Sequence, residues 1–355
     1  MAGSENQFIE FEKMCTSLSK VAIPKKLEKA EWIVLEKVHG ANFSFHMSQH
    51  GDAKVARRRA ILKENENFFA YLDAPFMKTY PKLMKDLRAG VNALFPDLKI
   101  SQISVWGELF GGIYVVDGTD LNTRNFKPVQ NEIQYCPDIN WVAYDISYRV
   151  EGSEEKHEYL DYDLAMQLFE RYDIFHCKPL FKGSMTQALN WDLNFQSTLS
   201  KILGMPALPK GTNNAEGVVV KPLKNTESED EFGEKQRIIV KLKSQQFAEI
   251  KDTVPTRGKN KNQQKPKLLS KVLAYATEQR LTNAISKHGF PDVKEVEERV
   301  VNEFVTDVFA DMRLDEGLSD EYDNAAETEK AKIRNSLTGK VAGFIKKQKR
   351  TTENL

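Results

Sequence analysis

The feature of this sequence that most constrains its fold is a break in composition after residue 254. Residues 255–266 contain no hydrophobic side chain and are bracketed by Pro255 and Pro266. Such a segment cannot contribute to a core and is typical of a linker or an exposed loop. The sequence therefore predicts two domains, residues 1–254 and residues 267–355, joined by a linker at residues 255–266.

The part before the linker carries short apolar runs rich in β-branched and aromatic residues, which predict strands. These runs are residues 32–35, 41–46, 103–106, 141–144, 218–220 and 238–240. Helices are predicted between them at residues 68–94 and 162–172. Because the strands show no regular βαβ alternation and no glycine-rich phosphate loop, the pattern favours an α+β domain with mainly antiparallel sheets.

The part after the linker shows helical patterns and no strand clusters. Apolar residues recur at helical spacing within residues 268–285, 296–312 and 327–347, which predicts a small all-helical domain. Lys271, Arg280 and Lys287 lie among these positions, and we expect them to contact RNA phosphates. The alternative is that the helices only stabilise the first domain. The basic residues 346–350 fit either a favourable charge at a helix C-terminus or an RNA contact.

The overall composition is that of an ordinary globular protein, with 41% hydrophobic and 29% charged residues in 355. No apolar run is long enough to cross a bilayer, so no membrane association is expected. The first residues are acidic, unlike a signal or transit peptide, and the three cysteines have no metal-ligand spacing. These features predict a reducing compartment, either cytoplasm or nucleus, or the host cytoplasm for a viral protein.

The net charge is zero, with 51 basic and 51 acidic residues. A protein that coats long nucleic acids is usually strongly basic, so the composition disfavours a non-specific binder. Any nucleic-acid surface must be local, as in an enzyme with a short footprint on its substrate.

Lys37 is the first candidate for chemistry. It follows a predicted buried strand and precedes a turn at Gly40, which would present its amine at the edge of a sheet. Lysine becomes a nucleophile when nearby cations or a metal favour loss of its proton. Alone the pattern is weak, because about one Lys-x-x-Gly match is expected by chance in a chain of this length.

Four further elements follow Lys37 and strengthen the pattern. They are Glu108 and the Tyr144-Asp145 pair, each predicted at a strand end, the run from Glu216 to Lys221, and Lys241 with Lys243 directly after an apolar strand. The two-residue period of a strand places the last two lysines on one face. They would repel one another unless they share an anion such as a polyphosphate. Each element alone has an ordinary structural explanation, but chance does not readily explain their order.

This ordered set resembles the five motifs of the covalent nucleotidyltransferases, which comprise DNA ligases, RNA ligases and mRNA capping enzymes. The closest resemblance is to the RNA ligase 2 family of phage repair ligases and kinetoplastid RNA-editing ligases. His39 stands where DNA ligases typically have Asp. Residues 56–61, 64–69, 135–139, 243–247 and 275–287 are also similar to that family. The resemblance covers nearly the whole chain from about Trp32 and implies an ATP-grasp-like nucleotidyltransferase domain.

The resemblance implies a role for each candidate residue. Lys37 would attack the α-phosphorus of ATP and carry AMP covalently, while Lys241 and Lys243 neutralise the growing phosphate charge and favour the neutral form of Lys37. A Mg²⁺ or Mn²⁺ ion would bind near Glu216. On its chemistry alone, Glu108 is a second candidate ligand for this ion.

The remaining roles concern the nucleotide and the RNA end. The resemblance implies that Tyr144 stacks on adenine, Glu36 reads the adenine edge, Glu108 accepts a ribose hydroxyl, His39 lies beside the leaving group or its metal, and Asn42 and Arg58 contact the nucleotide or the RNA 5′-phosphate. The register favours Arg58 among the three arginines at 57–59. Asp145 is either part of the site or structural.

The implied activity is ATP-dependent RNA repair by a monomer, which joins 3′-OH and 5′-phosphate RNA ends, chiefly at nicks in duplex RNA. The nearest alternative is a DNA ligase or a capping-type nucleotidyltransferase. Both normally place an OB-fold, a five-stranded barrel, where this chain is predicted to be helical. A second alternative is an inactive nucleic-acid-binding protein of ligase fold, which the occupied charged positions disfavour.

Overall fold

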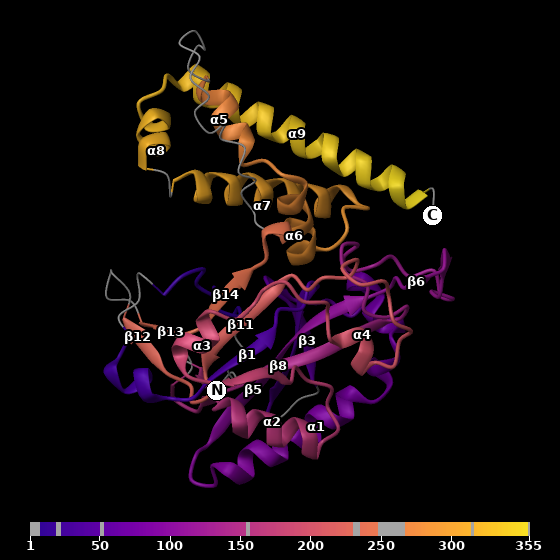
Figure 1. Cartoon of the computed structure of the whole chain (residues 1–355), viewed down its shortest axis with the longest axis vertical. Coiled ribbons are helices and arrows are strands. Elements are labelled where there is room, and N and C mark those ends of the chain that lie inside the picture. Colours follow the sequence, from indigo (N-terminus) through magenta and orange to yellow (C-terminus); the bar gives the residue numbers. More distant parts are fainter. Residues whose placement is uncertain are drawn as a thin grey trace, which may run out of the picture. The chain divides into compact units, whose positions relative to one another are not determined.

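The structure is a computed structural model that describes residues 8–18, 23–49, 53–153, 157–229, 235–247, 267–313 and 316–353. The predicted linker, residues 255–266, lies outside the described residues. The chain divides into two compact units, Met1–Gln246 and Phe247–Leu355 (Figure 1).

The first unit is built on two antiparallel sheets, which confirms the predicted α+β class. The six-stranded sheet has the order β4 (Ala60–Ile61), β3 (Lys54–Arg57), β2 (Ala41–Ser48), β5 (Ile100–Gly111), β8 (Ile139–Val150) and β9 (Glu158–Tyr159). The four-stranded sheet has the order β10 (Pro179–Gly183), β1 (Trp32–Glu36), β11 (Gly217–Pro222) and β14 (Val240–Lys243). Two short hairpins complete the set, β6 (Val115–Val116) with β7 (Thr119–Asp120) and β12 (Glu227–Glu229) with β13 (Lys235–Arg237).

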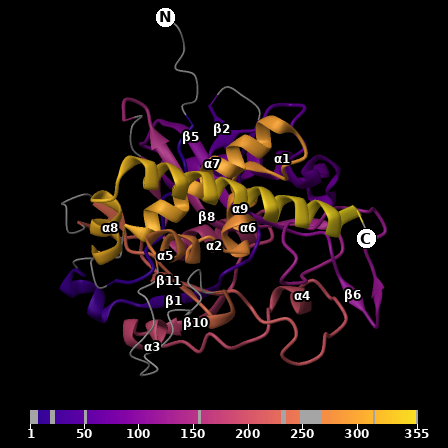
Figure 2. The same cartoon turned by 90° about the horizontal axis from the view of Figure 1, so that it is seen from above.

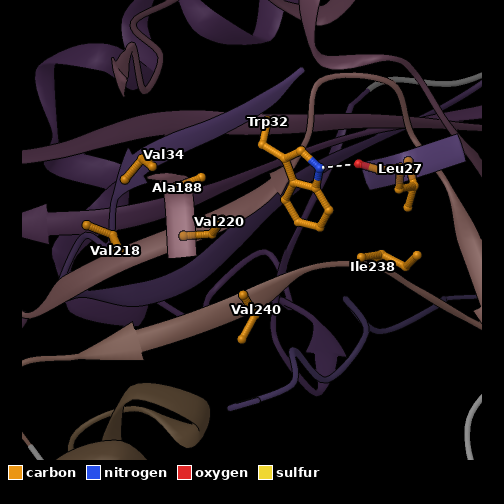
Figure 3. Packing of buried hydrophobic residues seen from close by; sticks show 8 residues of the cluster. All are labelled: Leu27, Trp32, Val34, Ala188, Val218, Val220, Ile238 and Val240. Carbon is orange, nitrogen blue, oxygen red and sulfur yellow. Dashed lines mark hydrogen bonds between the residues drawn. The ribbon is translucent and has the colours of Figure 1, made fainter. Parts of the chain in front are cut away.

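One face of the four-stranded sheet packs into a hydrophobic core (Figure 3). Its buried members are Leu27, Trp32, Val34, Ala188, Val218, Val220, Ile238 and Val240. The indole Nε1 of Trp32 donates a hydrogen bond of 3.0 Å to the carbonyl of Leu27, so the largest of these side chains leaves no polar atom unpaired. Since Val240 and Leu242 face this core, Lys241 and Lys243 lie on the opposite face of β14, as the two-residue period predicts.

Helices cover parts of this framework and differ in one place from the prediction. The main ones are α1 (Tyr80–Leu94) and α2 (Tyr162–Arg171), and the short ones are η1 (Lys25–Lys29), η2 (Phe68–Asp73), η3 (Pro75–Lys78), α3 (Met185–Leu189), α4 (Leu199–Ile202) and η4 (Gln245–Phe247). The prediction of one helix over residues 68–94 was wrong before Tyr80. Phe69 and Ala70 have positive φ values of 50° and 56°, and Pro75 cannot continue a helix begun before it.

The strands that carry the candidate residues are also longer than predicted. Glu108 lies inside β5 and Tyr144 inside β8, because both strands continue well past the predicted ends. The two lysines lie within β14 itself, which begins at Val240, so the prediction of a strand over residues 238–240 followed by the lysines was two residues too early.

The described residues of the second unit form helices joined by short turns, as predicted. It contains α5 (Leu268–Ala274), α6 (Glu278–His288), α7 (Lys294–Met312), α8 (Glu316–Asp323) and α9 (Glu327–Glu353). The long helix α9 packs against α5, α6 and α7 (Figures 1 and 2). The buried side chains recur at helical spacing, with Val300, Phe304, Val308 and Met312 on α7 and Ile333, Leu337, Val341 and Ile345 on α9.

The basic residues expected to contact RNA in this unit form ion pairs between its helices. Lys271 pairs with Glu321, Arg280 with Asp311, and Lys287 with Glu303 and Asp307. Arg280 is also only 2% exposed and donates to the carbonyls of Tyr275 and Asp307. The expectation that Arg280 contacts RNA phosphates is therefore corrected. Its buried guanidinium instead holds α6 against α7. In the described parts of both units, no helix is long and apolar enough to cross a membrane.

The position of Arg280 leads to a stability prediction. Arg280→Ala would leave the carbonyls of Tyr275 and Asp307 and the carboxylate of Asp311 without their donor, and the loss of donors to largely buried acceptors costs on the order of 1–3 kcal/mol. We expect Arg280→Ala to lower the urea midpoint of the helical unit clearly, measured by circular dichroism. The exposed Lys294→Ala should change it little, because its pair with Glu298 lies in solvent. Equal, small shifts in both variants would contradict the structural role of Arg280.

Candidate active site

The site is organised around the carboxylate of Glu216, which is 2% exposed and lies just before β11. One of its oxygens, Oε2, is 2.6 Å from Nζ of Lys37 and 3.3 Å from Nδ1 of His39. The other, Oε1, is 3.2 Å from Nζ of Lys243. A single buried carboxylate therefore gathers three basic side chains, which we call the Glu216 cluster.

The sheet register explains why these side chains meet. β11 lies between β1 and β14 (Figure 1), with Gly217 opposite Lys243. Lys37 extends the pairing of β1, since its backbone N–H donates to the carbonyl of Gly217 over 2.9 Å. A side chain at residue 217 would clash, because an added Cβ would lie 2.0 Å from the carbonyl oxygen of Leu242. The glycine thus permits the close approach of β14 beside Glu216.

The opposite charges in the Glu216 cluster stabilise one another's ionised forms. Burial alone would raise the pKa of Glu216, but Lys37, His39 and Lys243 hold it well below its usual range. Burial alone would lower the pKa of His39, but hydrogen bonds and charges from Glu132 and Glu216 outweigh it and raise that pKa. Glu216 is therefore ionised, and its surroundings favour a charged imidazole beside it.

Glu132 and Tyr135 fix His39 in place, and the sequence did not reveal either role. His39 Nε2 lies 3.1 Å from Glu132 Oε2, and its backbone N–H donates to the hydroxyl of Tyr135 over 2.8 Å. The hydrogen bond from His39 holds the pKa of Glu132 below its usual range, although burial opposes this shift. The only available signal was that Tyr135 lies in a stretch similar to the RNA ligase 2 family.

Glu108 approaches the cluster from the six-stranded sheet, where it lies opposite Asn42. Burial, together with the charge of Glu216, raises the pKa of Glu108 to about 7 against the opposing charges of Lys37, His39 and Arg58. The two sheets of the first unit therefore meet at this site, because each contributes a carboxylate to it.

The structure distinguishes the three consecutive arginines. Arg57 pairs with Glu66 at 3.3 Å, and Arg59 pairs with Glu10 at 3.0 Å. The charge of Arg58 instead acts on Glu108 and Tyr144. This placement agrees with the register that favoured Arg58.

Tyr144 occupies a β-bulge in β8. Its neighbours Ala143 and Asp145 pair with Gly107 and Trp106, and Tyr144 has no partner opposite it in the ladder. Bulges re-aim a side chain relative to the regular pleat. The Tyr144 hydroxyl accepts a 2.6 Å hydrogen bond from Asn42 Nδ2, while Asn42 Oδ1 is buried without a hydrogen-bond partner among the described residues. Asn42 therefore retains an acceptor that a bound nucleotide could use after a small movement.

Glu36 is buried at the end of β1. Its carboxylate accepts hydrogen bonds from the Ser197 hydroxyl at 2.6 Å, and from the Thr198 amide and hydroxyl at 2.7 and 2.6 Å. Burial raises the pKa of Glu36 despite these three bonds. It lines a small pocket with Phe175, His176, Thr198 and Leu199. Sequence reasoning missed Ser197 and Thr198, because nothing local marks them as partners of a residue so distant in the chain.

Asp145 belongs to a separate set of buried ion pairs. Its oxygens lie 2.7 Å from Lys221 Nζ and 3.2 Å from an Arg237 nitrogen, and all three side chains are buried. This arrangement favours the structural alternative for Asp145.

The raised pKa of Glu108 gives a pH prediction. A carboxyl group whose pKa is higher in the folded state stabilises the fold below its unfolded pKa, and this stability is lost as pH rises toward about 7. Glu108→Gln should therefore gain stability relative to the wild type between about pH 5 and about pH 8, by on the order of 1 kcal/mol after allowance for solvent screening.

Thermal unfolding of both proteins at the two pH values measures this difference. Glu64→Gln, at an exposed position, serves as the control. Its stability relative to the wild type should be the same at both pH values. A stability difference between wild type and Glu108→Gln that does not change with pH would contradict the assigned environment.

Comparisons with known proteins agree with the resemblance seen in the motifs. Residues 30–243 match the RNA ligase family, and residues 259–343 match the T4 RNA ligase 2 C-terminal family. In the described part of the chain, the strands of the first unit fall within the first match, and α5 to α8 with the first part of α9 fall within the second.

The individual proteins that are similar to this chain include two RNA-editing ligases. RNA-editing ligase 1, mitochondrial, of Trypanosoma brucei brucei is 30% identical over 247 residues, which cover 63% of this chain and 51% of that protein. RNA-editing ligase 2, mitochondrial, of the same organism is 32% identical over 210 residues, covering 54% and 48%. The chain spans about half the length of the curated relatives it matches.

A solved structure of a Naegleria gruberi RNA ligase variant with ATP and Mn is 15% identical, with a TM-score of 0.40, and covers 67% of this chain and 57% of that one. The match to the RNA ligase family covers more than half of the sequence and includes the whole Glu216 cluster. The chain therefore belongs to the RNA ligase family, and its C-terminal part is of the RNA ligase 2 type.

Proposed function

We propose that this chain is an ATP-dependent RNA ligase that joins 3′-OH and 5′-phosphate RNA ends, chiefly at nicks in duplex RNA. The observation that carries the proposal is the Glu216 cluster, in which the candidate nucleophile Lys37 lies 2.6 Å from a buried, ionised carboxylate. Glu216 holds the Lys37 amine in place at the end of β1, and the flanking cations, together with a metal bound to Glu216, would release that amine to attack the phosphoanhydride of ATP.

The reaction proceeds in three transfers. Lys37 Nζ attacks the α-phosphorus of ATP, so that a P–N bond forms and the bond to pyrophosphate breaks. In the course of this step the Lys37 ammonium releases two protons to solvent and keeps one on the phosphoramidate nitrogen. The RNA 5′-phosphate then takes AMP from Lys37, which returns the free lysine. In the last transfer the RNA 3′-hydroxyl attacks this activated phosphate and AMP leaves, which completes the phosphodiester bond.

The basic residues of β14 and His39 form the phosphate-binding side of the site. Lys241 and Lys243 share the face of the strand turned away from the core. Together with His39, they would neutralise negative charge as it develops on the phosphate and the leaving group. Positive groups already fixed in position need no rearrangement during the reaction.

A divalent metal fits this site through Glu216. In the described residues no group of three or more acidic, His or Cys side chains is arranged to hold a metal. Mg²⁺ commonly binds through one or two carboxylates together with substrate phosphates, so the single ionised carboxylate of Glu216 is a sufficient protein ligand. A bound Mg²⁺ or Mn²⁺ would supply additional positive charge at the phosphates.

The nucleoside end of ATP would lie between the two sheets. We assign Tyr144 as the stacking surface for adenine, with Asn42 and Arg58 as contacts to the nucleotide or the RNA 5′-phosphate. Glu108 would accept a ribose hydroxyl. Glu36 would meet the adenine edge from the pocket that it lines, where Ser197 and Thr198 fix the orientation of its carboxylate.

The helical second unit favours an RNA ligase over the alternatives. A DNA ligase or capping enzyme would be expected to continue into a five-stranded barrel, whereas the described residues after 267 form helices. The inactive-protein alternative would leave the buried charges of the Glu216 cluster without a role. Action as a monomer and a location in the cytoplasm or nucleus remain predictions.

The first prediction concerns the nucleophile. Lys37→Ala should lose AMP labelling by ATP and sealing of 5′-phosphate RNA, because no amine remains to accept AMP. It should still seal RNA that already carries a 5′-adenylate, since the last transfer does not use the lysine as a nucleophile. Comparison of nicked duplex with single-stranded RNA in the same assay tests the substrate preference. Labelling of Lys37→Ala at the wild-type level would exclude this assignment.

The second prediction concerns the charge that surrounds Glu216. Lys243→Met removes one cation from the cluster while keeping most of the side-chain volume. The rate of Lys37 adenylylation should fall on the order of 100-fold, the typical cost of losing a group that stabilises transition-state charge. Lys224→Met is the matched control, because Lys224 pairs with Asp161 and Asp163 in a different part of the unit. A normal rate in Lys243→Met would refute the phosphate-binding role.

A further inference from the structure

The described N-terminal residues lie along the candidate site. We call residues 8–15 the N-terminal strap. The ring of Phe11, which is 3% exposed, lies at its centre and packs in a cluster with Trp106 and Tyr159. The predicted functional motifs begin only at Glu36, so no motif marked this segment.

Phe11 also contacts the residue assigned to stack on adenine. Its ring centroid lies 5.2 Å from that of Tyr144, with the planes inclined at 72°, an edge-to-face arrangement. It lies 5.3 Å from Trp106 and 6.0 Å from Tyr159, so these aromatic contacts fix its own position. The Tyr144 ring is therefore held at its hydroxyl by Asn42, and Phe11 packs on the ring in an edge-to-face contact.

The strap is fastened on both sides of this contact. Glu12 accepts a 2.9 Å hydrogen bond from Arg237, which also binds Asp145, the neighbour of Tyr144. Cys15 pairs with the start of β14, because its N–H donates to the carbonyl of Ile239 and its carbonyl accepts from the N–H of Lys241. The strap thus joins the bulge of β8 to the strand that carries Lys241 and Lys243.

A residue in a β-bulge needs such support. Tyr144 lacks a partner opposite it in the ladder, so side-chain contacts must determine the direction of its ring. Of the contacts described above, the one with Phe11 is made with the ring itself, and it comes from a segment outside the Glu216 cluster. It keeps the ring in one orientation before the nucleotide arrives, which reduces the entropy lost on binding.

We propose that Phe11 is a positioning residue for the nucleotide, which acts by holding the ring of Tyr144 in the orientation that stacks on adenine. This inference rests on the proposed function. It predicts that Phe11 affects the binding of ATP and has little effect on the transfer of AMP to Lys37 once ATP is bound.

The test measures Lys37 adenylylation at increasing ATP in the full chain. Phe11→Ala should raise the ATP concentration for half-maximal rate about 3- to 10-fold, the equivalent of one aromatic pair, with the maximal rate nearly unchanged. Phe8→Ala is the matched control, because Phe8 belongs to the same strap but packs on His46 at 5.7 Å. It should leave both quantities close to wild type.

A double-mutant comparison separates positioning from general loss of packing. In a Tyr144→Leu background, Phe11→Ala should have little further effect on half-saturating ATP, because the ring it positions is gone. Phe11→Leu keeps much of the side-chain volume but lacks the aromatic ring. It replaces Phe11→Ala in the test if the circular-dichroism melt shows that Phe11→Ala does not fold. Phe11→Leu should still raise the ATP concentration at which the rate of Lys37 adenylylation is half-maximal.

Two outcomes would overturn the inference. One is wild-type half-saturating ATP in folded Phe11→Ala and Phe11→Leu. The other is an equal rise in the presence and absence of the Tyr144 ring. Failure of the proposed function is distinguishable from both, because the wild-type protein itself would then form no Lys37–AMP.

Discussion

The burial of the Glu216 carboxylate is the constraint on which the rest of this site depends. An ionised acid removed from water is costly unless it is paired and hydrogen-bonded. Here Lys37 and His39, which follow β1, and Lys243 on β14 supply the compensation from two distant segments of the chain. Since each of these groups is also needed for the proposed chemistry, the interaction that stabilises the site before ATP binds is the one that arranges it for phosphate transfer.

That arrangement depends in turn on the register of the four-stranded sheet. One face of β1, β11 and β14 packs in the hydrophobic core around Trp32, Val218 and Val240. A slip of one residue would turn Lys241 and Lys243 into this core, which would bury two charges without partners. Core packing and the direction of the lysines therefore specify each other, and Gly217 permits the close strand approach that both require.

Local sequence patterns were sufficient to locate the central strands β1, β2, β5, β8 and β11, the shared face of Lys241 and Lys243, and the helical second part of the chain. They could not predict features that arise from contacts between distant segments. The bulge at Tyr144, the support of Glu36 by Ser197 and Thr198, and the bond between His39 and Glu132 are all of this kind. The helix predicted over residues 68–94 failed for the related reason that tertiary packing of Phe68, Phe69 and Tyr71 overrides the helical pattern there. The sequence could nominate Lys37 and Arg58 as candidates, but it could not predict the contacts that hold them in place.

The central claim is that Lys37 accepts AMP within the Glu216 cluster, and mass spectrometry of the purified chain tests it most directly. After incubation with ATP and Mg²⁺, the intact protein should gain the mass of one AMP, and peptide mapping should place it on Lys37. Addition of pyrophosphate should remove the adduct by reversing the transfer. Absence of an adduct under these conditions, or its location on a different residue, would contradict this account of the site.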